Sequence, residues 1–182
     1  MGDNGTLRIA IYIDGPNLKS YLYDKRIRLS FEKLLRHLEG IKHLRDHRAG
    51  KIVLRKYFFD VTSPLRNNDG TADFLRRECD FEIIKVLKKK FSRECNRELH
   101  KEFKSLTDQA ITVSIMDDIW NKRFDVIVLV SGDSDYTRVL RYCKEEKRAR
   151  VEVCFWSTAT AQELRQVADL FIDLGEHGHL LC

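Results

Sequence analysis

Two short motifs place carboxylates directly after apolar runs, and these residues are the ones best suited to chemistry. Asp14 follows the run 7–13, and Asp133 and Asp135 follow the run 126–130 within the segment SGDSD. Carboxylates brought close together repel each other and lose water, so they need a cation, a proton or hydrogen-bond donors. Asp oxygens without Cys or His nearby suit Mg²⁺ or Mn²⁺. Such an ion can clamp a phosphate oxygen, which predicts phosphodiester hydrolysis.

A simpler interpretation is that Asp133 and Asp135 only turn the chain and cap the next helix, since Asp and Ser favour such positions. An apolar run followed by Asp occurs twice, at Asp14 and at Asp133. This repetition makes it a weaker explanation that both residues are only caps. The carboxyl ends of parallel strands are also where ligands bind in open sheets. Gly132 would allow a tight turn, or a close approach of the backbone to a ligand.

Polar side chains beside the acids are candidates for substrate binding. Asn17 could donate a hydrogen bond to a phosphate, or orient a carboxylate without adding charge. Ser131, Ser134 and Thr137 could hydrogen-bond the acids or a phosphate. Backbone amides at the helix start after Gly132 would also favour an anion.

Strand and helix patterns alternate along the chain and would position these residues. Short β-branched runs predict strands, and apolar residues at helical spacing predict helices. This alternation predicts an α/β fold, a three-layer sandwich with a mainly parallel central sheet. The predicted strands are 7–13, 51–59, 81–87, 126–130 and 150–156, and a short apolar segment stands at 170–174. The predicted helices are 30–44, 71–77, 107–120, 136–147 and 160–167.

The helix predicted for 107–120 offers a further acid. With Thr107 as its N-cap, Asp108 would stand in the first turn, more than two turns from Asp118 at about 1.5 Å per residue. We therefore favour Asp108 as the partner of the strand-end acids. The preceding segment 88–106 is dense in basic residues. It is either an arm that binds phosphates or a solvated insertion.

Composition indicates one globular domain over residues 1–182, with flexible tails at 1–6 and 175–182 and a basic insertion at 88–106. The formal net charge of +5 modestly favours a polyanionic partner. The five cysteines have no CxxC spacing, which is typical of reduced thiols. No apolar run is long enough to span a membrane. These features predict a cytoplasmic protein that has no membrane partner.

Other α/β chemistries fit the sequence less well. A haloacid-dehalogenase-type phosphatase needs a DxD motif after its first strand. Here the residue two positions before Asp14 is Tyr12, so the motif is missing. The chain has no GxxxxGK[ST] phosphate loop, no GxGxxG fingerprint and no GxSxG elbow.

The segments IYIDGPN and VSGDSDY resemble the motifs of the NYN domain, in the LabA-like branch of the PIN-like nuclease superfamily. The resemblance spans residues 7–174, with 107–111 in the family's middle motif and 168–174 in its last. It implies a PIN-like (Rossmannoid) fold. Two positions depart from the family pattern: Lys104 stands four residues before the middle Asp, where a closer Lys is usual, and Gln109 replaces a common Val.

By this resemblance the chain would be a metal-dependent endoribonuclease acting on single-stranded RNA. A non-catalytic RNA- or nucleotide-binding regulatory module is the alternative, and a homodimer is left open. The predicted catalytic residues are Asp14, Asp108, Asp133, Asp135 and Asn17. The four acids would hold Mg²⁺ or Mn²⁺, and the predicted substrate-binding residues are Asn17, Ser131, Ser134, Thr137 and Lys104.

Overall fold

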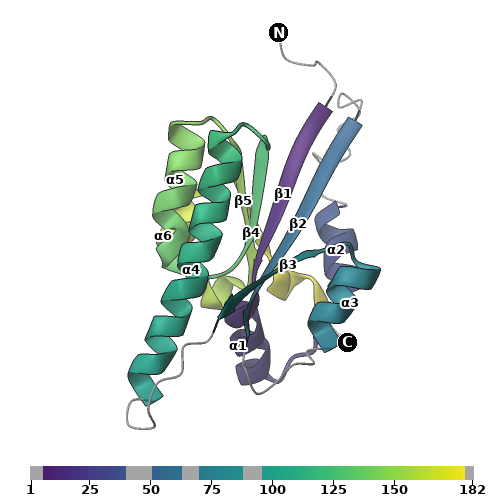
Figure 1. Ribbon diagram of the computed structural model, residues 1–182, viewed down its shortest axis with the longest axis vertical. Helices are drawn as coiled ribbons and strands as arrows, with labels where there is room; N and C mark the ends of the chain where they lie inside the picture. The colour runs from purple at the N-terminus through teal and green to yellow at the C-terminus, as the bar shows by residue number, and fades with distance from the viewer. Residues whose placement is uncertain (1–5, 40–50, 63–69, 88–95, 179–182) are drawn as a thin grey trace.

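A parallel sheet of six strands forms the middle layer of the molecule (Figure 1). The computed structural model describes residues 6–39, 51–62, 70–87 and 96–178. The strands lie in the order β3-β2-β1-β4-β5-β6, and every neighbouring pair is parallel. The predicted α/β sandwich is confirmed, and the sheet is parallel throughout the described residues.

The elements follow the predicted alternation closely. The strands are β1 (Thr6–Asp14), β2 (Lys51–Thr62), β3 (Glu82–Leu87), β4 (Val126–Val130), β5 (Arg150–Phe155) and β6 (Leu170–Asp173). The helices are α1 (Gly15–Lys25), α2 (Phe31–Glu39), α3 (Gly70–Glu78), α4 (Asn96–Trp120), α5 (Thr137–Glu145) and α6 (Gln162–Val167). Short 3-10 turns are η1 (Ser134–Tyr136), η2 (Ser157–Ala159) and η3 (Leu174–Glu176).

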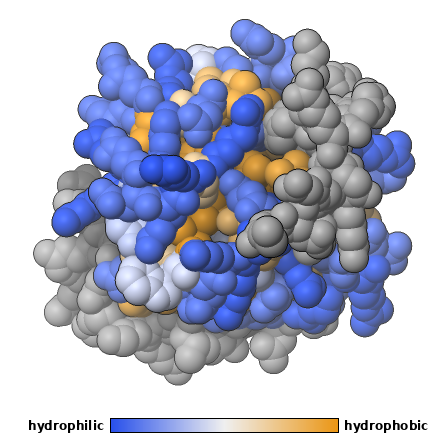
Figure 2. Space-filling view, turned by 90° about the horizontal axis from the view of Figure 1, so that it is seen from above, coloured by the Kyte–Doolittle hydropathy of each residue, from blue (hydrophilic) through white to orange (hydrophobic). Residues whose placement is uncertain are grey.

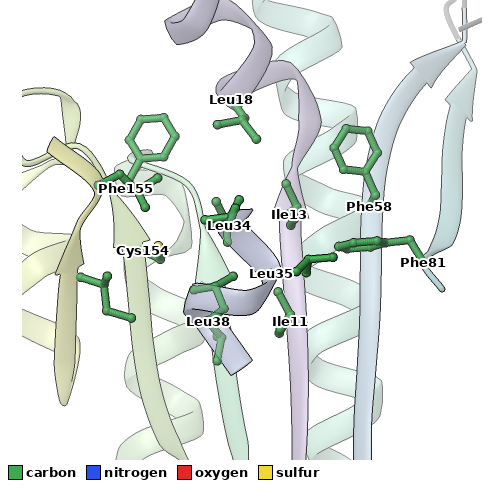
Figure 3. Close-up of a cluster of buried hydrophobic side chains, with 14 of the residues drawn as sticks. Ile11, Ile13, Leu18, Leu34, Leu35, Leu38, Phe58, Phe81, Cys154 and Phe155 are labelled. Atoms are coloured by element: carbon green, nitrogen blue, oxygen red, sulfur yellow. The ribbon is translucent and has the colours of Figure 1, made fainter. Parts of the chain in front are cut away.

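One face of the sheet packs against α1, α2 and α3. Alternate residues of β1 point to this face, including Ile11 and Ile13, and they meet Leu34 and Leu38 of α2 (Figure 3). Alternation arises because successive side chains of a strand point to opposite faces. This layer closes the side of the sheet on which β1 leads through α1 and α2 into β2.

The opposite face packs against α4, α5 and α6. The intervening β1 residues Ala10 and Tyr12 lie here with Ile111 and Ile115 of α4 and Leu140 of α5. Every residue of β4 is buried, because helices cover both of its faces. The unbroken apolar, mostly β-branched sequence of β4 reflects burial on both faces.

The order of the strands reverses between β1 and β4. The chain moves outward from β1 to β3 on one side, then returns and builds β4 to β6 on the other. The pairing of Ile13 with Val130 brings the residues that follow, Asp14 and Ser131, to the same edge of the sheet. In open α/β sheets such a reversal opens a crevice at the carboxyl ends of the strands, where ligands bind.

Helix α4 begins earlier than predicted. It starts at Asn96, so Thr107 lies inside the helix and is fully buried, and the prediction of Thr107 as an N-cap was wrong. Asp108 accordingly lies well inside the helix and not in its first turn. Residues 96–106, predicted as part of a basic insertion, form the first turns of α4. Those turns extend beyond the end of the sheet in Figure 1.

The remaining boundaries differ by smaller amounts. Ser30 lies just before α2 and its hydroxyl accepts the Lys33 N–H at 3.3 Å, as a cap does. Residues 40–44 of that predicted helix and 88–95 of the predicted insertion lie outside the described residues. Part of the predicted C-terminal tail is ordered as η3, and the His177 ring lies 4.1 Å from that of His37.

Figure 2 looks onto the molecule from the top of Figure 1, where β1 begins. Hydrophilic residues cover most of the coloured surface, and hydrophobic residues show in a band between them. No helix in the described part of the chain combines the length and the apolar character that crossing a membrane requires.

Candidate functional site

Three carboxylates meet at the edge where the strand order reverses. Asp108 of α4 and Asp133 and Asp135, which follow β4, each offer one oxygen, and these oxygens all lie within 4.8 Å of one another. Asp108 and Asp133 are 6% and 7% exposed, whereas Asp135 is exposed to solvent. The group is therefore anchored in the protein and open on one side.

Asp133 has a structural role as well as a place in the cluster. It is the N-cap of η1, and its Oδ1 accepts the Asp135 N–H at 3.2 Å. Its own N–H donates to the hydroxyl of Ser131 at 3.3 Å. The cap interpretation and the site interpretation of this residue thus both hold. The cap directs the chain so that Asp133 and Asp135 lie on the same side.

Asp14 lies beside the three acids without joining the group. It is 1% exposed and is the N-cap of α1, where its Oδ1 accepts the Asn17 N–H at 3.1 Å. Its Oδ2 accepts hydrogen bonds from Ser131 Oγ at 3.1 Å and Tyr136 OH at 2.9 Å. This carboxylate is therefore fixed by three donors, and its role as a metal ligand stays a prediction.

Tyr136 is the site residue that the sequence reasoning missed. Its side chain is fully buried, and its hydroxyl lies 2.9 Å from Asp14 Oδ2 and 3.0 Å from Asp108 Oδ1. Burial and the two nearby carboxylates raise the pKa of Tyr136, so the phenol keeps its proton and acts as a donor. The residue closes the VSGDSDY motif, but no pattern in the sequence shows that it turns inward.

Asn17 links the two motifs. Its side-chain Oδ1 accepts the N–H of Gly132 at 3.1 Å, which joins the start of α1 to the segment after β4. Ser131 is fully buried and its hydroxyl donates to Asp14, so it orients an acid.

The other predicted substrate-binding residues differ in their surroundings. Ser134 is exposed on η1 beside Asp135. Thr137 begins α5, and its Oγ1 is buried without a hydrogen-bond partner in the described structure. Lys104 lies in α4, but its side chain is outside the described residues.

Gly132 and Gly15 are needed for close packing within the chain. A Cβ on Gly132 would lie 2.2 Å from the carbonyl oxygen of Ala159, and one on Gly15 would lie 2.4 Å from that of Phe59. No described glycine has a positive φ. At Gly132 the close contacts are with Ala159 and Phe155 of the protein itself, and a close approach to a ligand stays a prediction.

Asp118 serves a different purpose on the same helix as Asp108. It accepts a hydrogen bond from Tyr12 OH at 2.5 Å and pairs with Arg123 at 3.0 Å. The prediction that Asp108 and Asp118 do not share one site is confirmed by these separate partners. The contact ties the last turns of α4 to β1.

The donor set is made of oxygen only, which suits a hard divalent cation and fits neither zinc nor copper well. Asp135 is exposed, so solvent reaches the group on its side. The residues present therefore fit the Mg²⁺ or Mn²⁺ predicted from the sequence.

A parallel α/β sheet with an acidic cluster at its switch point defines a Rossmann-like domain with a candidate metal centre. The NYN domain model matches residues 8–175, and the chain belongs to that family. NYN domains are part of the PIN-like nuclease superfamily, whose members are generally nucleases that use divalent metals. The family and the buried Asp cluster together support a hydrolase role.

A solved crystal structure shares this fold. It is a protein of unknown function from Vibrio parahaemolyticus, with a TM-score of 0.70 and 20% sequence identity. The match covers 100% of this chain and 99% of the other. No match was found among curated protein sequences.

Proposed function

We propose that this chain is a divalent-metal-dependent endoribonuclease of the LabA-like branch, which hydrolyses phosphodiester bonds of single-stranded RNA in the cytoplasm. The observation that carries the proposal is the group of three carboxylates within 4.8 Å at the switch point of the sheet. Two of them are buried, and burying a charge is costly unless it is compensated. A bound cation would provide that compensation and a reason for the arrangement.

Asp108, Asp133 and Asp135 would hold Mg²⁺ or Mn²⁺. Such a cation supplies positive charge against the phosphate oxygens and acidifies a water molecule for attack. Asp135 is the exposed member, so it is the acid that a phosphate from solvent would meet first. The side-chain oxygen of Asn17 accepts the Gly132 N–H. The side-chain NH₂ group of Asn17 would therefore donate to a phosphate oxygen.

RNA as the partner is supported by the family and by the formal net charge of +5. Two further groups would favour an anion at the cluster. The first N–H groups of α5 follow directly after η1 and carry partial positive charge. Thr137 is the first residue of the same helix, and its hydroxyl has no hydrogen-bond partner in the described structure.

The test is cleavage of an end-labelled single-stranded RNA with Mg²⁺, with Mn²⁺ and with EDTA, comparing wild type with Asp135→Asn. Asp135 is exposed, so the substitution should leave the fold intact. Asp117→Asn is the matched control, an exposed acid on α4 that pairs with Arg123. We expect Asp135→Asn to reduce cleavage by more than about 100-fold, since even indirect partners of metal ligands contribute about 10–100-fold. Asp117→Asn should cleave as wild type does.

Cleavage that persists in EDTA or in Asp135→Asn would refute the proposed site. A folded wild type that binds RNA without cleaving it would refute the nuclease and favour the non-catalytic binding module.

A further inference from the structure

One buried hydroxyl lies between carboxylates from two different layers of the fold. Tyr136 OH is 2.9 Å from Asp14 Oδ2, at the end of β1, and 3.0 Å from Asp108 Oδ1, on α4. Tyr136 itself belongs to η1, which contains Asp135 and has Asp133 as its N-cap. A single phenol therefore connects the sheet, the helix and the loop that build the site.

The surroundings of Asp14 fix where that phenol lies. Asp14 accepts hydrogen bonds from Asn17 N–H and Ser131 Oγ in addition to Tyr136. A carboxylate with several donors has little freedom to rotate, so the Tyr136 hydroxyl is held in one place. The same hydroxyl also donates to one oxygen of Asp108, sharing its single proton between the two carboxylates, and so restricts the Asp108 carboxylate in turn.

Asp108 needs such a restraint more than its partners do. Asp133 and Asp135 come from one short turn, in which Asp133 caps the chain and accepts the Asp135 N–H. Asp108 comes from a separate helix, α4, which packs against η1. Metal sites depend on groups that orient the ligands, and losing one typically weakens binding by about 10–100-fold.

We propose that Tyr136 is a positioning residue that holds the Asp108 carboxylate in its metal-binding orientation, and that Asp14 acts on the site through this hydroxyl. The inference rests on the metal site of the proposed function, but not on cleavage of RNA.

The test compares Tyr136→Phe with Tyr12→Phe by calorimetric titration with Mn²⁺ alone and by thermal unfolding without metal. Tyr12 is a matched control because it is also fully buried, and its hydroxyl also donates to an acid of α4, Asp118. Both substitutions delete one buried hydroxyl beside a carboxylate, so both should lower the unfolding temperature. Only Tyr136→Phe should weaken Mn²⁺ binding, by about 10–100-fold.

Asp14→Asn, alone and combined with Tyr136→Phe, tests the second half of the proposal. If Asp14 acts through the hydroxyl, the Mn²⁺ affinity of the double variant should equal that of the single variant that binds Mn²⁺ more weakly. Losses that multiply would make Asp14 an independent contributor and overturn that half.

Unchanged Mn²⁺ binding in Tyr136→Phe, an equal loss in Tyr12→Phe, or a wild type that binds no Mn²⁺ would overturn the positioning role. A wild type that binds Mn²⁺ with the expected dependence on Tyr136 but cleaves no RNA would support the inference and refute only the nuclease.

Discussion

Replacing Gly132 with alanine should destabilise the protein because the added methyl group has no room. Its Cβ would lie 2.2 Å from the Ala159 carbonyl oxygen and 2.7 Å from Cδ1 of Phe155. Real Cβ contacts are essentially never shorter than 3.0 Å, so the Ala159 backbone would have to move by about 0.8 Å. That shift would strain the hydrogen bond from Ala161 N–H to the Gly132 carbonyl oxygen, which is 3.0 Å long.

The magnitude follows from these contacts. Forced overpacking costs about 1–3 kcal/mol, and weakening one backbone hydrogen bond adds about 0.5–1.5 kcal/mol. The smaller entropy of the unfolded alanine chain offsets about 0.4–1 kcal/mol. These ranges together span about 0.5–4 kcal/mol, so we expect the free energy of unfolding to fall by about 2 kcal/mol. Urea denaturation followed by circular dichroism measures it, with a midpoint lower by about 1 M for a slope of about 2 kcal/mol/M.

Gly70→Ala is the matched control, because a Cβ at Gly70 would meet nothing within 4 Å. Gly70 is the first residue of α3, so alanine there should leave stability unchanged or raise it by up to about 1 kcal/mol. If the free energy of unfolding of Gly132→Ala lies within about 0.5 kcal/mol of the wild-type value, the loop after β5 is not packed against Gly132 as described, and the reasoning fails.

Three further results are expected. Tyr12→Phe should lower the free energy of unfolding by about 1.5–3 kcal/mol in urea titrations, because Asp118 loses a buried charged hydrogen bond; a neutral effect would contradict that contact. The hydrogen bonds from Arg8 lower the pKa of Asp125 in the folded protein. Their contribution to the free energy of unfolding is therefore present above about pH 4, and it is lost as the pH falls through the lowered pKa of the folded state. Urea midpoints from pH 7 to 3 should show the advantage of wild type over Asp125→Asn shrinking at acid pH; a constant gap would contradict the assignment. Mn²⁺ at about 100 times its Kd should raise the unfolding temperature by about 5–10 °C in scanning calorimetry; Asp135→Asn should lose most of this rise, and an equal rise in both would place the ion elsewhere.

The sequence alone determined the class of fold and indicated all three places from which the acids come: the ends of β1 and β4 and the helix that carries Asp108. Strands buried on both faces are mostly apolar, so β4 is visible as an unbroken apolar run and the inner part of β1 as an apolar run rich in isoleucine. Parallel strands end at one edge of a sheet, which already brought Asp14 and Asp133 near each other. These inferences succeed because burial imposes a local pattern on consecutive residues.

The start of α4 was predicted poorly because local signals conflicted. The residues after Asn96 are mostly charged and were interpreted as an insertion, although Glu, Leu and Lys are good helix formers. Thr107 resembles a cap in sequence, but inside α4 it is fully buried. Packing against the sheet decides between such alternatives, and this packing cannot be inferred from a short segment of sequence.

Only the tertiary structure decided which polar groups touch. Tyr136 lies 122 residues from Asp14 and 28 from Asp108, and no spacing relates them. Their contact depends on the strand order, on the face that α4 covers, and on one 3-10 turn that directs the phenol inward. The sequence specifies acids at strand ends because each is a local consequence of its own strand; the hydroxyl that joins them results from three separate elements packing together.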